Sequence, residues 1–300
     1  MSITQSRDKV AASSARKVTP QSLLEKKQNH QPITALTAYD YPTARLVDEA
    51  GIDIILVGDS LAMTVLGHED TLSLTVDEML HHTRAVRRAT RSALLCVDMP
   101  YGSYHTGTKS ALRNAIRLIK EGGAEAVKIE GGASRASLIH QLTLAEIPVV
   151  GHIGLTPQSL HRMGGYRVQG RSLDAIDMLM ADAAALESAG AIAIVLEGVP
   201  REVAARITAV SEIPIIGIGA GPDCDGQILV FHDLVNLTFA PGAKFVRRFA
   251  DADTLMRHGI ELYRDAVVER SFPNDSESYH LPAHVRHIFE PSETPEPQPA

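Results

Sequence analysis

The sequence predicts an α/β fold, a closed (βα)8 or TIM barrel, and three observations lead to this prediction. Short apolar runs rich in β-branched residues alternate with longer amphipathic runs from residue 33 onward. About eight such pairs follow one another, each of about 30 residues. The short runs are apolar throughout, which is typical of parallel strands buried on both faces. At 300 residues the chain suits a barrel better than an open doubly wound sheet.

The elements are expected in a regular order. Residues 1–18 form a predicted disordered tail, and a capping helix begins at Pro20 behind the N-cap Thr19. Seven strands are predicted at 33–38, 53–58, 93–98, 126–130, 148–152, 192–197 and 214–219, with a possible eighth at 226–234. Helices are predicted at 43–51, 76–90, 110–123, 134–146, 174–190, 202–212 and 251–270. A single barrel domain is therefore expected at 19–270, followed by a Pro- and Glu-rich tail at 271–300 that is predicted to be disordered.

Composition narrows the class of protein. The formal charge of −7 argues against nucleic acid or an anionic membrane as a partner. The chain has no apolar run near the ~18 residues of a membrane span. The first 18 residues lack the apolar core of a secretory signal, so a cytoplasmic location is expected, although transit peptides have a similar composition. Cys96 and Cys224 have no metal-binding or redox spacing, and Cys96 is expected in the core.

Acidic residues stand at the ends of three consecutive predicted strands. Asp59, Asp98 and Glu130 occupy these positions. In a parallel barrel the carboxyl ends of the strands share the face where active sites are built. Crowded carboxylates repel one another, and a divalent cation such as Mg²⁺ removes that conflict. The three residues are therefore predicted metal ligands, although an acid at a strand end can instead cap a turn.

Two further polar residues lie close to these acids in the sequence. Lys128 is two residues before Glu130, so both side chains are expected on one face of the strand. There the lysine can hold an anionic substrate, or it can form a buried ion pair without chemistry. Ser60 follows Asp59 and can bind a ligand or complete the turn.

His152 and Glu197 end the fifth and sixth predicted strands. The apolar run before Glu197 suits a general base, since desolvation raises the pKa of a carboxyl group. His152 can orient a ligand, act as an acid, or serve as a core histidine. A metal and a base on opposite sides of one site predict a metal-held enolate, although hydrolysis by metal-bound water is also compatible.

Two glycine-rich segments also fall at strand ends. GIGAG at 217–221 is a weak match to a phosphate-binding turn, and its glycines can instead allow a tight exit from the strand. Residues 151–171 contain five glycines and are predicted to be a loop that acts as a lid.

Many motifs in one order resemble the ketopantoate (3-methyl-2-oxobutanoate) hydroxymethyltransferase family. The resemblance covers about residues 33–250 and rests on LTAYDYPTARLVDEAGID, ILVGDSLAM, VLGHEDTLSLT, HTRAVRRA, VDMPYGSY, AVKIEGG, GHIGLTPQS, GGYRVQGR, VLEGVP, IPIIGIGAG and DGQILVFHD. Ala62 stands where the family usually has glycine, and Pro222-Asp223-Cys224 follows GIGAG where asparagine is common. These departures affect loops and no charged site residue.

The resemblance implies an enzyme of pantothenate (coenzyme A) biosynthesis. It implies hydroxymethyl transfer from 5,10-methylenetetrahydrofolate to 3-methyl-2-oxobutanoate, giving 2-dehydropantoate, with one Mg²⁺ per subunit and a homodecamer. Mapped onto this chain, it implies metal ligands Asp59, Asp98 and Glu130. It implies substrate contacts at Asp59, Ser60, Asp98, Lys128 and His152, and Glu197 as proton acceptor.

Two rival interpretations remain. A barrel of the phosphoenolpyruvate mutase and isocitrate lyase group would share enolate chemistry, but its lyases carry a Lys-Cys-Gly-His motif that this sequence lacks. A non-catalytic barrel that binds a metal or keto acid is the second rival, and the intact acids, lysine and base argue against it.

Overall fold

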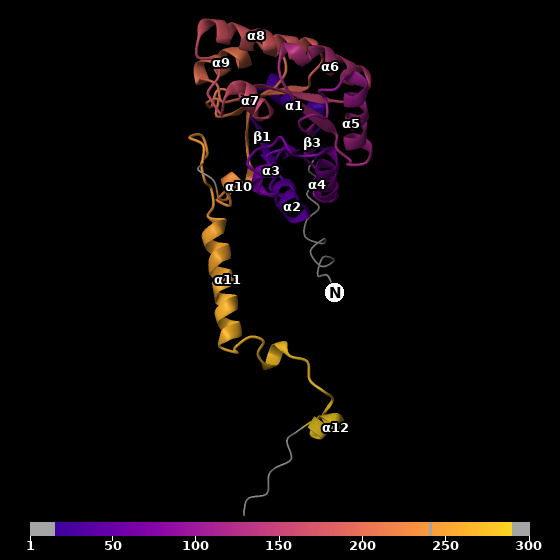
Figure 1. The fold of residues 1–300 in the computed structure, drawn as a ribbon, viewed down its shortest axis with the longest axis vertical. Coiled ribbons are helices and arrows are strands. Elements are labelled where there is room, and N and C mark those ends of the chain that lie inside the picture. The colour runs from indigo at the N-terminus through magenta and orange to yellow at the C-terminus, as the bar shows by residue number, and fades with distance from the viewer. Residues whose placement is uncertain (1–15, 240–241, 290–300) are drawn as a thin grey trace, which may run out of the picture. The chain divides into compact units, whose positions relative to one another are not determined.

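The computed structural model describes residues 16–239 and 242–289, in two units, Met1–Ala250 and Asp251–Ala300 (Figure 1). Most of the predicted N-terminal tail and the end of the predicted C-terminal tail lie outside the described residues. Arg16, Lys17 and Val18 are described, and Val18 N–H donates to the carbonyl of Ser92 at 2.8 Å. The predicted tail therefore joins the barrel unit before residue 19.

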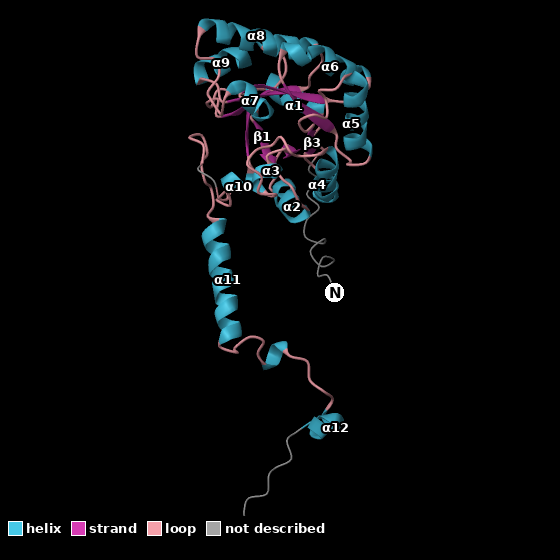
Figure 2. Ribbon diagram, in the orientation of Figure 1, coloured by secondary structure: helices cyan, strands magenta, loops and turns pink. Residues whose placement is uncertain are grey.

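The first unit confirms the barrel prediction. In the described part of the chain, eight parallel strands close in sequence order, and β1 pairs with both β2 and β8. Figure 2 shows the strands among the helices of this unit. The strands are β1 (Ile33–Thr37), β2 (Ile54–Val57), β3 (Leu94–Asp98), β4 (Ala126–Glu130), β5 (Val149–Gly154), β6 (Ala193–Glu197), β7 (Ile215–Ile218) and β8 (Gly226–Leu229). Parallel strands buried on both faces explain why these segments are apolar throughout.

Helices connect the strands and cover the outside of the barrel. They are α1 (Pro20–Gln28), α2 (Tyr41–Glu49), α3 (Leu61–Thr64), α4 (Val76–Ala89), α5 (Thr108–Lys120), α6 (Ala133–Leu144), η2 (Pro157–Ser159), α7 (Leu160–Met163), α8 (Leu173–Ser188), α9 (Arg201–Val210) and α10 (Phe231–Leu234). The second unit contains α11 (Ala252–Val268), η3 (Asp275–Glu277), α12 (Ala283–Arg286) and η4 (His287–Phe289).

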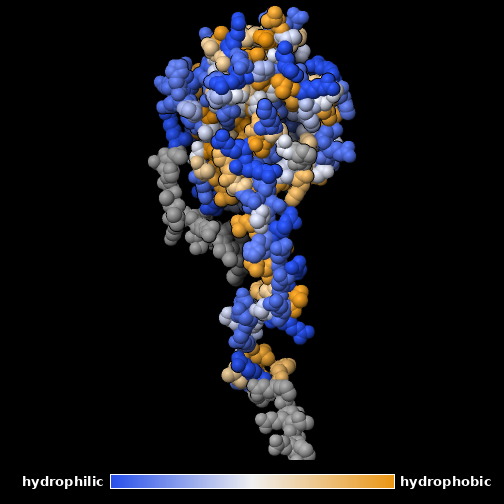
Figure 3. Space-filling view, turned by 90° about the vertical axis from the view of Figure 1, so that its left-hand side faces the viewer, coloured by the Kyte–Doolittle hydropathy of each residue, from blue (hydrophilic) through white to orange (hydrophobic). Residues whose placement is uncertain are grey.

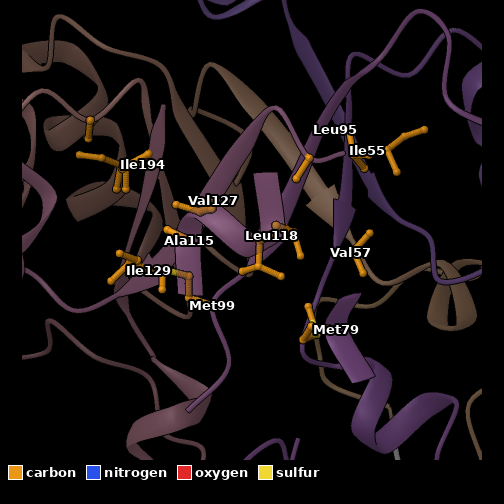
Figure 4. Packing of buried hydrophobic residues seen from close by; sticks show 14 of the residues in the cluster. Ile55, Val57, Met79, Leu95, Met99, Ala115, Leu118, Val127, Ile129 and Ile194 are labelled. Atoms are coloured by element: carbon orange, nitrogen blue, oxygen red, sulfur yellow. The ribbon is translucent and has the colours of Figure 1, made fainter. Parts of the chain in front are cut away.

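The side chains of alternate residues along each strand belong to two different hydrophobic layers. On β2, Ile54 and Leu56 belong to the layer inside the barrel, whereas Ile55 and Val57 belong to the layer between strands and helices. Figure 4 shows part of the outer layer, where Leu118 of α5 packs among strand residues. The two layers hold the strand ends in a defined register, which places the polar residues there.

Helix α1 is anchored beneath the barrel, as its sequence predicted. Thr19 and Ser22 form a capping box, and Pro20 occupies the first turn. Leu23 is fully buried and belongs to the inner layer. Lys26 pairs with Asp53 at 2.5 Å, directly before β2. These contacts fasten α1 to the ends of the strands that lie opposite the polar residues.

Two predicted boundaries are corrected. The eighth strand ends at Leu229 instead of residue 234, because its partner β1 ends at Thr37. Beyond that point the N–H of Phe231 donates to the Thr37 hydroxyl and not to a backbone carbonyl of β1. Residues 151–171 are not a continuous loop, since they include the end of β5, η2 and α7. The last predicted helix forms as α11, but it belongs to the second unit. The domain limits 19–270 stay a prediction.

No helix in the described ranges is long and apolar enough to span a membrane.

Candidate active site

Polar side chains gather where the parallel strands reach their carboxyl ends. Asp98 and Glu130 are the last residues of β3 and β4, and Asp59 follows β2 by two residues. His152 lies in β5, and Glu197 ends β6. All of these residues except Glu197 are at most 5% exposed. The structure thus brings together, over five consecutive strands, the acids and the histidine that the sequence analysis selected.

The strand register decides which of these groups form pairs. Asp98 lies opposite Lys128, and the lysine Nζ is 3.0 Å from Asp98 Oδ1. Glu130 lies opposite His152, and His152 Nδ1 is 3.3 Å from Glu130 Oε1. Lys128 is buried on the same strand as Glu130, yet its ion pair is with Asp98. Neighbouring strands are about 4.8 Å apart, whereas residues i and i+2 of one strand are about 6.6 Å apart.

Burial and mutual repulsion shift the pKa values of the acids. The pKa of Asp59 is raised well above its ordinary range by burial, then by Asp98 and Glu130. Burial also raises the pKa of Asp98, although Lys128 opposes this shift. Burial alone would raise the pKa of Glu130, but His152 and Lys128 outweigh it, and the pKa is lowered. Ionisation of Asp59 and Asp98 is therefore unfavourable in this site, and a cation placed between the acids would favour it.

The two basic groups respond to the same charge. Burial lowers the pKa of Lys128, but the surrounding carboxylates outweigh it and raise that pKa, so the group stays an ammonium. Burial and Lys128 lower the pKa of His152, yet Glu130 and Glu197 outweigh them and raise it to about 9. Lys128 Nζ is 3.1 Å from His152 Nδ1, a hydrogen bond only when the imidazole is neutral. The protonation state of His152 therefore depends on two opposing influences. Glu130 and Glu197 favour the protonated imidazole, whereas burial and Lys128 oppose it.

The three acids fit a hard cation by donor chemistry. Asp98 Oδ1 and Glu130 Oε1 are buried, and their nearest partners are the cationic groups of Lys128 and His152. Oxygen ligands of this kind favour Mg²⁺. Within the described residues, however, no three His, Cys, Asp or Glu side chains form a ready metal-holding group. The acids are a candidate site through their chemistry, and a bound ion would have to draw them closer together.

Glu197 stands beside the acids at the end of β6. Its side chain is 17% exposed, and His152 Nε2 lies 3.3 Å from its Oε2. The histidine thus lies between Glu130 and Glu197, so the surroundings of Glu197 are less apolar than its strand sequence predicted. A carboxylate that is both accessible and held by a neighbour is suited to take a proton from a bound substrate.

Ser60 is held by a residue that the sequence analysis missed. Its hydroxyl is 2.8 Å from that of Tyr39, which is 1% exposed and follows β1. Burial raises the pKa of Tyr39 to about 12, so the phenol stays neutral. A tyrosine directly after a predicted strand was the available signal.

Gln158 is a second missed residue. It lies in η2, is 6% exposed, and its side-chain amide donates to Asp59 Oδ2 at 2.8 Å. Tyr104, also buried, donates to its Oε1 at 2.5 Å. The signal was a neutral polar residue in GLTPQS, just after a strand that ends in the site.

The segment between β5 and α8 contacts two other parts of this face, the turn after β6 and helix α3. Gln169 N–H donates to the carbonyl of Gly198, after β6, at 2.9 Å. The Tyr166 hydroxyl is 3.9 Å from the sulfur of Met63 in α3, and Tyr166 is half exposed. The lid role of this segment stays a prediction. In GIGAG, a Cβ at Gly219 (φ +61°) would lie 2.5 Å from Phe245, so that glycine allows close packing in a tight turn.

Fold and site together define the class of protein, a (βα)8 barrel with a cluster of buried ionisable groups at the carboxyl ends of its strands. The chain belongs to the ketopantoate hydroxymethyltransferase family, whose model matches residues 17–275. A 3-methyl-2-oxobutanoate hydroxymethyltransferase from Koribacter versatilis is 67% identical over 91% of this chain and 93% of its own. One of the same name from Pelobacter propionicus is 53% identical over 88% of this chain and 98% of its own.

Solved structures confirm the fold. A phosphonopyruvate hydrolase crystallised with oxalate and Mg²⁺ is similar with a TM-score of 0.59 at 16% identity, covering 86% of this chain and 92% of that one. A 2,3-dimethylmalate lyase of the phosphoenolpyruvate mutase and isocitrate lyase superfamily has a TM-score of 0.55 at 17% identity, covering 87% and 88%. The rival group named from the sequence therefore shares this barrel, while the family model and the sequence relatives belong to the transferase.

Proposed function

We propose that this protein transfers a hydroxymethyl group from 5,10-methylenetetrahydrofolate to 3-methyl-2-oxobutanoate, giving 2-dehydropantoate for pantothenate and coenzyme A biosynthesis. The observation that carries this proposal is the 67% identity, over 91% of the chain, to a relative named for this activity. The buried acids, lysine and histidine at the barrel mouth support it, since a 2-keto acid needs cationic partners for its carboxylate and a base near C3.

Mg²⁺, one ion per subunit, is the proposed cofactor, and Asp59, Asp98 and Glu130 would hold it. When bound, the ion would draw electron density from the keto carbonyl and so make the C3 proton more acidic. Lys128 and Ser60 are placed to bind the oxygens of the keto acid.

Glu197 is the proposed proton acceptor. Its carboxylate would take the proton from C3, leaving an enolate. Water would add to the methylene carbon of the folate and break both of its C–N bonds, so that tetrahydrofolate leaves and the carbon becomes formaldehyde. The enolate C3 would then bond to this carbon, whose oxygen takes a proton and becomes the hydroxyl of the product. His152, 3.3 Å from Glu197 Oε2, would orient this carboxylate and stabilise it by its charge. General bases of this kind contribute about 10²- to 10⁴-fold to a rate.

Exchange of the C3 proton tests the proposal without folate. The protein, Mg²⁺ and 3-methyl-2-oxobutanoate are mixed in D₂O, and loss of the C3 proton signal is followed by NMR. Exchange is expected with the wild type and is expected to fall about 10²- to 10⁴-fold in Glu197→Gln. Glu202→Gln, at an exposed position of α9, is the matched control.

Undiminished exchange in Glu197→Gln would show that another group is the base. If the wild type catalyses neither exchange nor product formation with the folate, the non-catalytic barrel becomes the better interpretation. Product formation without exchange would mean that folate must bind before the proton is removed.

We further propose a homo-oligomer, a decamer by family resemblance, located in the cytoplasm. Apolar side chains exposed on the second unit support association (Figure 3). Those on α11 are Leu255, Met256, Ile260, Leu262, Tyr263, Val267 and Val268. An apolar surface of this kind, which its own unit does not cover, marks an interaction site. Light scattering coupled to size exclusion measures the mass, and a monomer would contradict the proposal.

A further inference from the structure

Gln158 is a buried polar residue to which the reaction assigns no role. It lies in η2 (Pro157–Ser159), directly after β5, and is 6% exposed. Burying an amide is unfavourable unless its hydrogen bonds are made. The hydrogen bonds that Gln158 makes therefore indicate its role in the site.

Each of the three acids is held through one oxygen by an N–H group. Gln158 Nε2 donates to Asp59 Oδ2 at 2.8 Å, and the backbone N–H of Gln158 donates to Glu130 Oε2 at 2.9 Å. The backbone N–H of Asp59 donates to Asp98 Oδ2 at 2.9 Å. One residue thus supplies two of these three bonds, to carboxylates at the ends of two different strands.

The opposite oxygens of two of these acids face cationic side chains. Lys128 Nζ is 3.0 Å from Asp98 Oδ1, and His152 Nδ1 is 3.3 Å from Glu130 Oε1. These oxygens therefore lie where positive charge is already attracted, which is the side that a bound cation would share. A carboxylate held at one oxygen cannot turn freely, so its second oxygen keeps a defined direction. This pattern is typical of residues behind metal ligands, which orient the ligand from the side away from the ion.

The amide of Gln158 is itself fixed in orientation. The Tyr104 hydroxyl donates to Oε1 at 2.5 Å, and Nε2 also donates to the Met99 carbonyl at 3.0 Å. An acceptor role for Oε1 and a donor role for Nε2 are thereby defined, and the nitrogen faces Asp59. As a neutral donor, Gln158 holds the acid without adding charge to the site.

We propose that Gln158 is a positioning residue for the cation site: it links Asp59 and Glu130 so that the three carboxylates keep their second oxygens directed toward one ion. This inference rests on the proposed function, because it takes Asp59, Asp98 and Glu130 as the ligands. It predicts that Gln158 controls the affinity for the ion without touching it.

Mn²⁺ binding measured by electron paramagnetic resonance tests the inference apart from turnover. Gln158→Met keeps the size and the backbone N–H but removes the amide. Its Kd for Mn²⁺ is expected to rise about 10- to 100-fold. Gln141→Met, at an exposed position of α6, should bind as the wild type does. Circular dichroism establishes that each variant is folded at the temperature used, and thermal unfolding without metal is recorded beside it.

A purely structural role would lower the unfolding temperature of Gln158→Met and leave the Kd of the folded molecules unchanged; that result overturns the inference. If this variant does not fold, Gln158→Asn replaces it, since its amide is one methylene too short to reach Asp59, and an unchanged Kd there has the same meaning. Asp98→Asn separates the two proposals. If wild type and Asp98→Asn bind Mn²⁺ equally, the metal site itself is wrong, whereas a difference there with none for Gln158→Met rejects only the role of Gln158.

Discussion

Lys128 should contribute strongly to stability in the absence of a metal ion. It is 5% exposed, and its Nζ lies 3.0 Å from Asp98 Oδ1. Lys128→Met keeps most of the side-chain volume and removes the charge, which leaves a buried cluster of acids with one counter-charge fewer. Removing one partner of a buried ion pair costs about 3–5 kcal/mol.

That free energy converts into a measurable shift. For a domain of this size, each kcal/mol lowers the midpoint of thermal unfolding by about 2–4 °C, so Lys128→Met should unfold about 6–20 °C below the wild type. The assay is thermal unfolding followed by circular dichroism in EDTA. Lys109→Met, at an exposed position of α5, is the control, with an expected change of about 1–2 °C.

The pH dependence gives the sign of the effect. Burial already raises the pKa of Asp98 while Lys128 opposes this, so the variant should have a still higher pKa at Asp98. A carboxyl whose pKa is raised by folding favours the native state fully below its unfolded pKa, and this contribution is lost as pH rises through the folded value. The decrease in unfolding temperature caused by Lys128→Met should therefore be smaller near pH 5 than near pH 8. Unfolding of Lys128→Met at the same temperature as Lys109→Met would refute this reasoning.

Three other predictions concern residues around the site and the barrel frame. Burial raises the pKa of Tyr39 from 10.0 to about 12, so the stability contributed by the neutral phenol is complete below pH 10 and is lost between about pH 10 and 12. Tyr39→Phe should therefore reduce the fall in the free energy of urea unfolding over that pH range. An unchanged fall in the variant would contradict this. The Asp48 carboxylate accepts three backbone N–H groups just before β3, so Asp48→Asn should lower the free energy of urea unfolding by about 3 kcal/mol, and a loss below about 0.5 kcal/mol would count against it. A Cβ on Gly154 (φ +91°) would lie 2.2 Å from the carbonyl oxygen of Glu197, so Gly154→Ala should displace the base and slow C3 exchange about 100-fold. Gly164→Ala, also at positive φ (+66°) but with nothing within 4 Å, should exchange normally, and equal rates in the two variants would show that contact with Glu197 is not the cause.

The positions of the charged site residues follow from sequence patterns. Each of Asp59, Asp98, Glu130 and Glu197 comes at or just after the end of an apolar run, and a parallel barrel brings all such ends to one face. Strand and helix periods are local properties, so the number and order of the elements of the barrel, and the helix cap at Thr19, could be predicted from neighbouring residues. The eighth strand was predicted too long, because its end depends on β1, its distant partner.

Only the tertiary structure decided which groups meet. Strand register pairs Lys128 with Asp98 and His152 with Glu130, and register is a property of two strands together. Gln158 reaches Asp59 across 99 residues of sequence, and Tyr39 reaches Ser60 from a neighbouring strand end. No local pattern encodes such contacts, since they exist only after the barrel closes and brings the segments after β1, β2 and β5 to one face. The sequence by itself therefore determined where the charged groups of the site would stand, and barrel closure determined how they are paired, held and oriented.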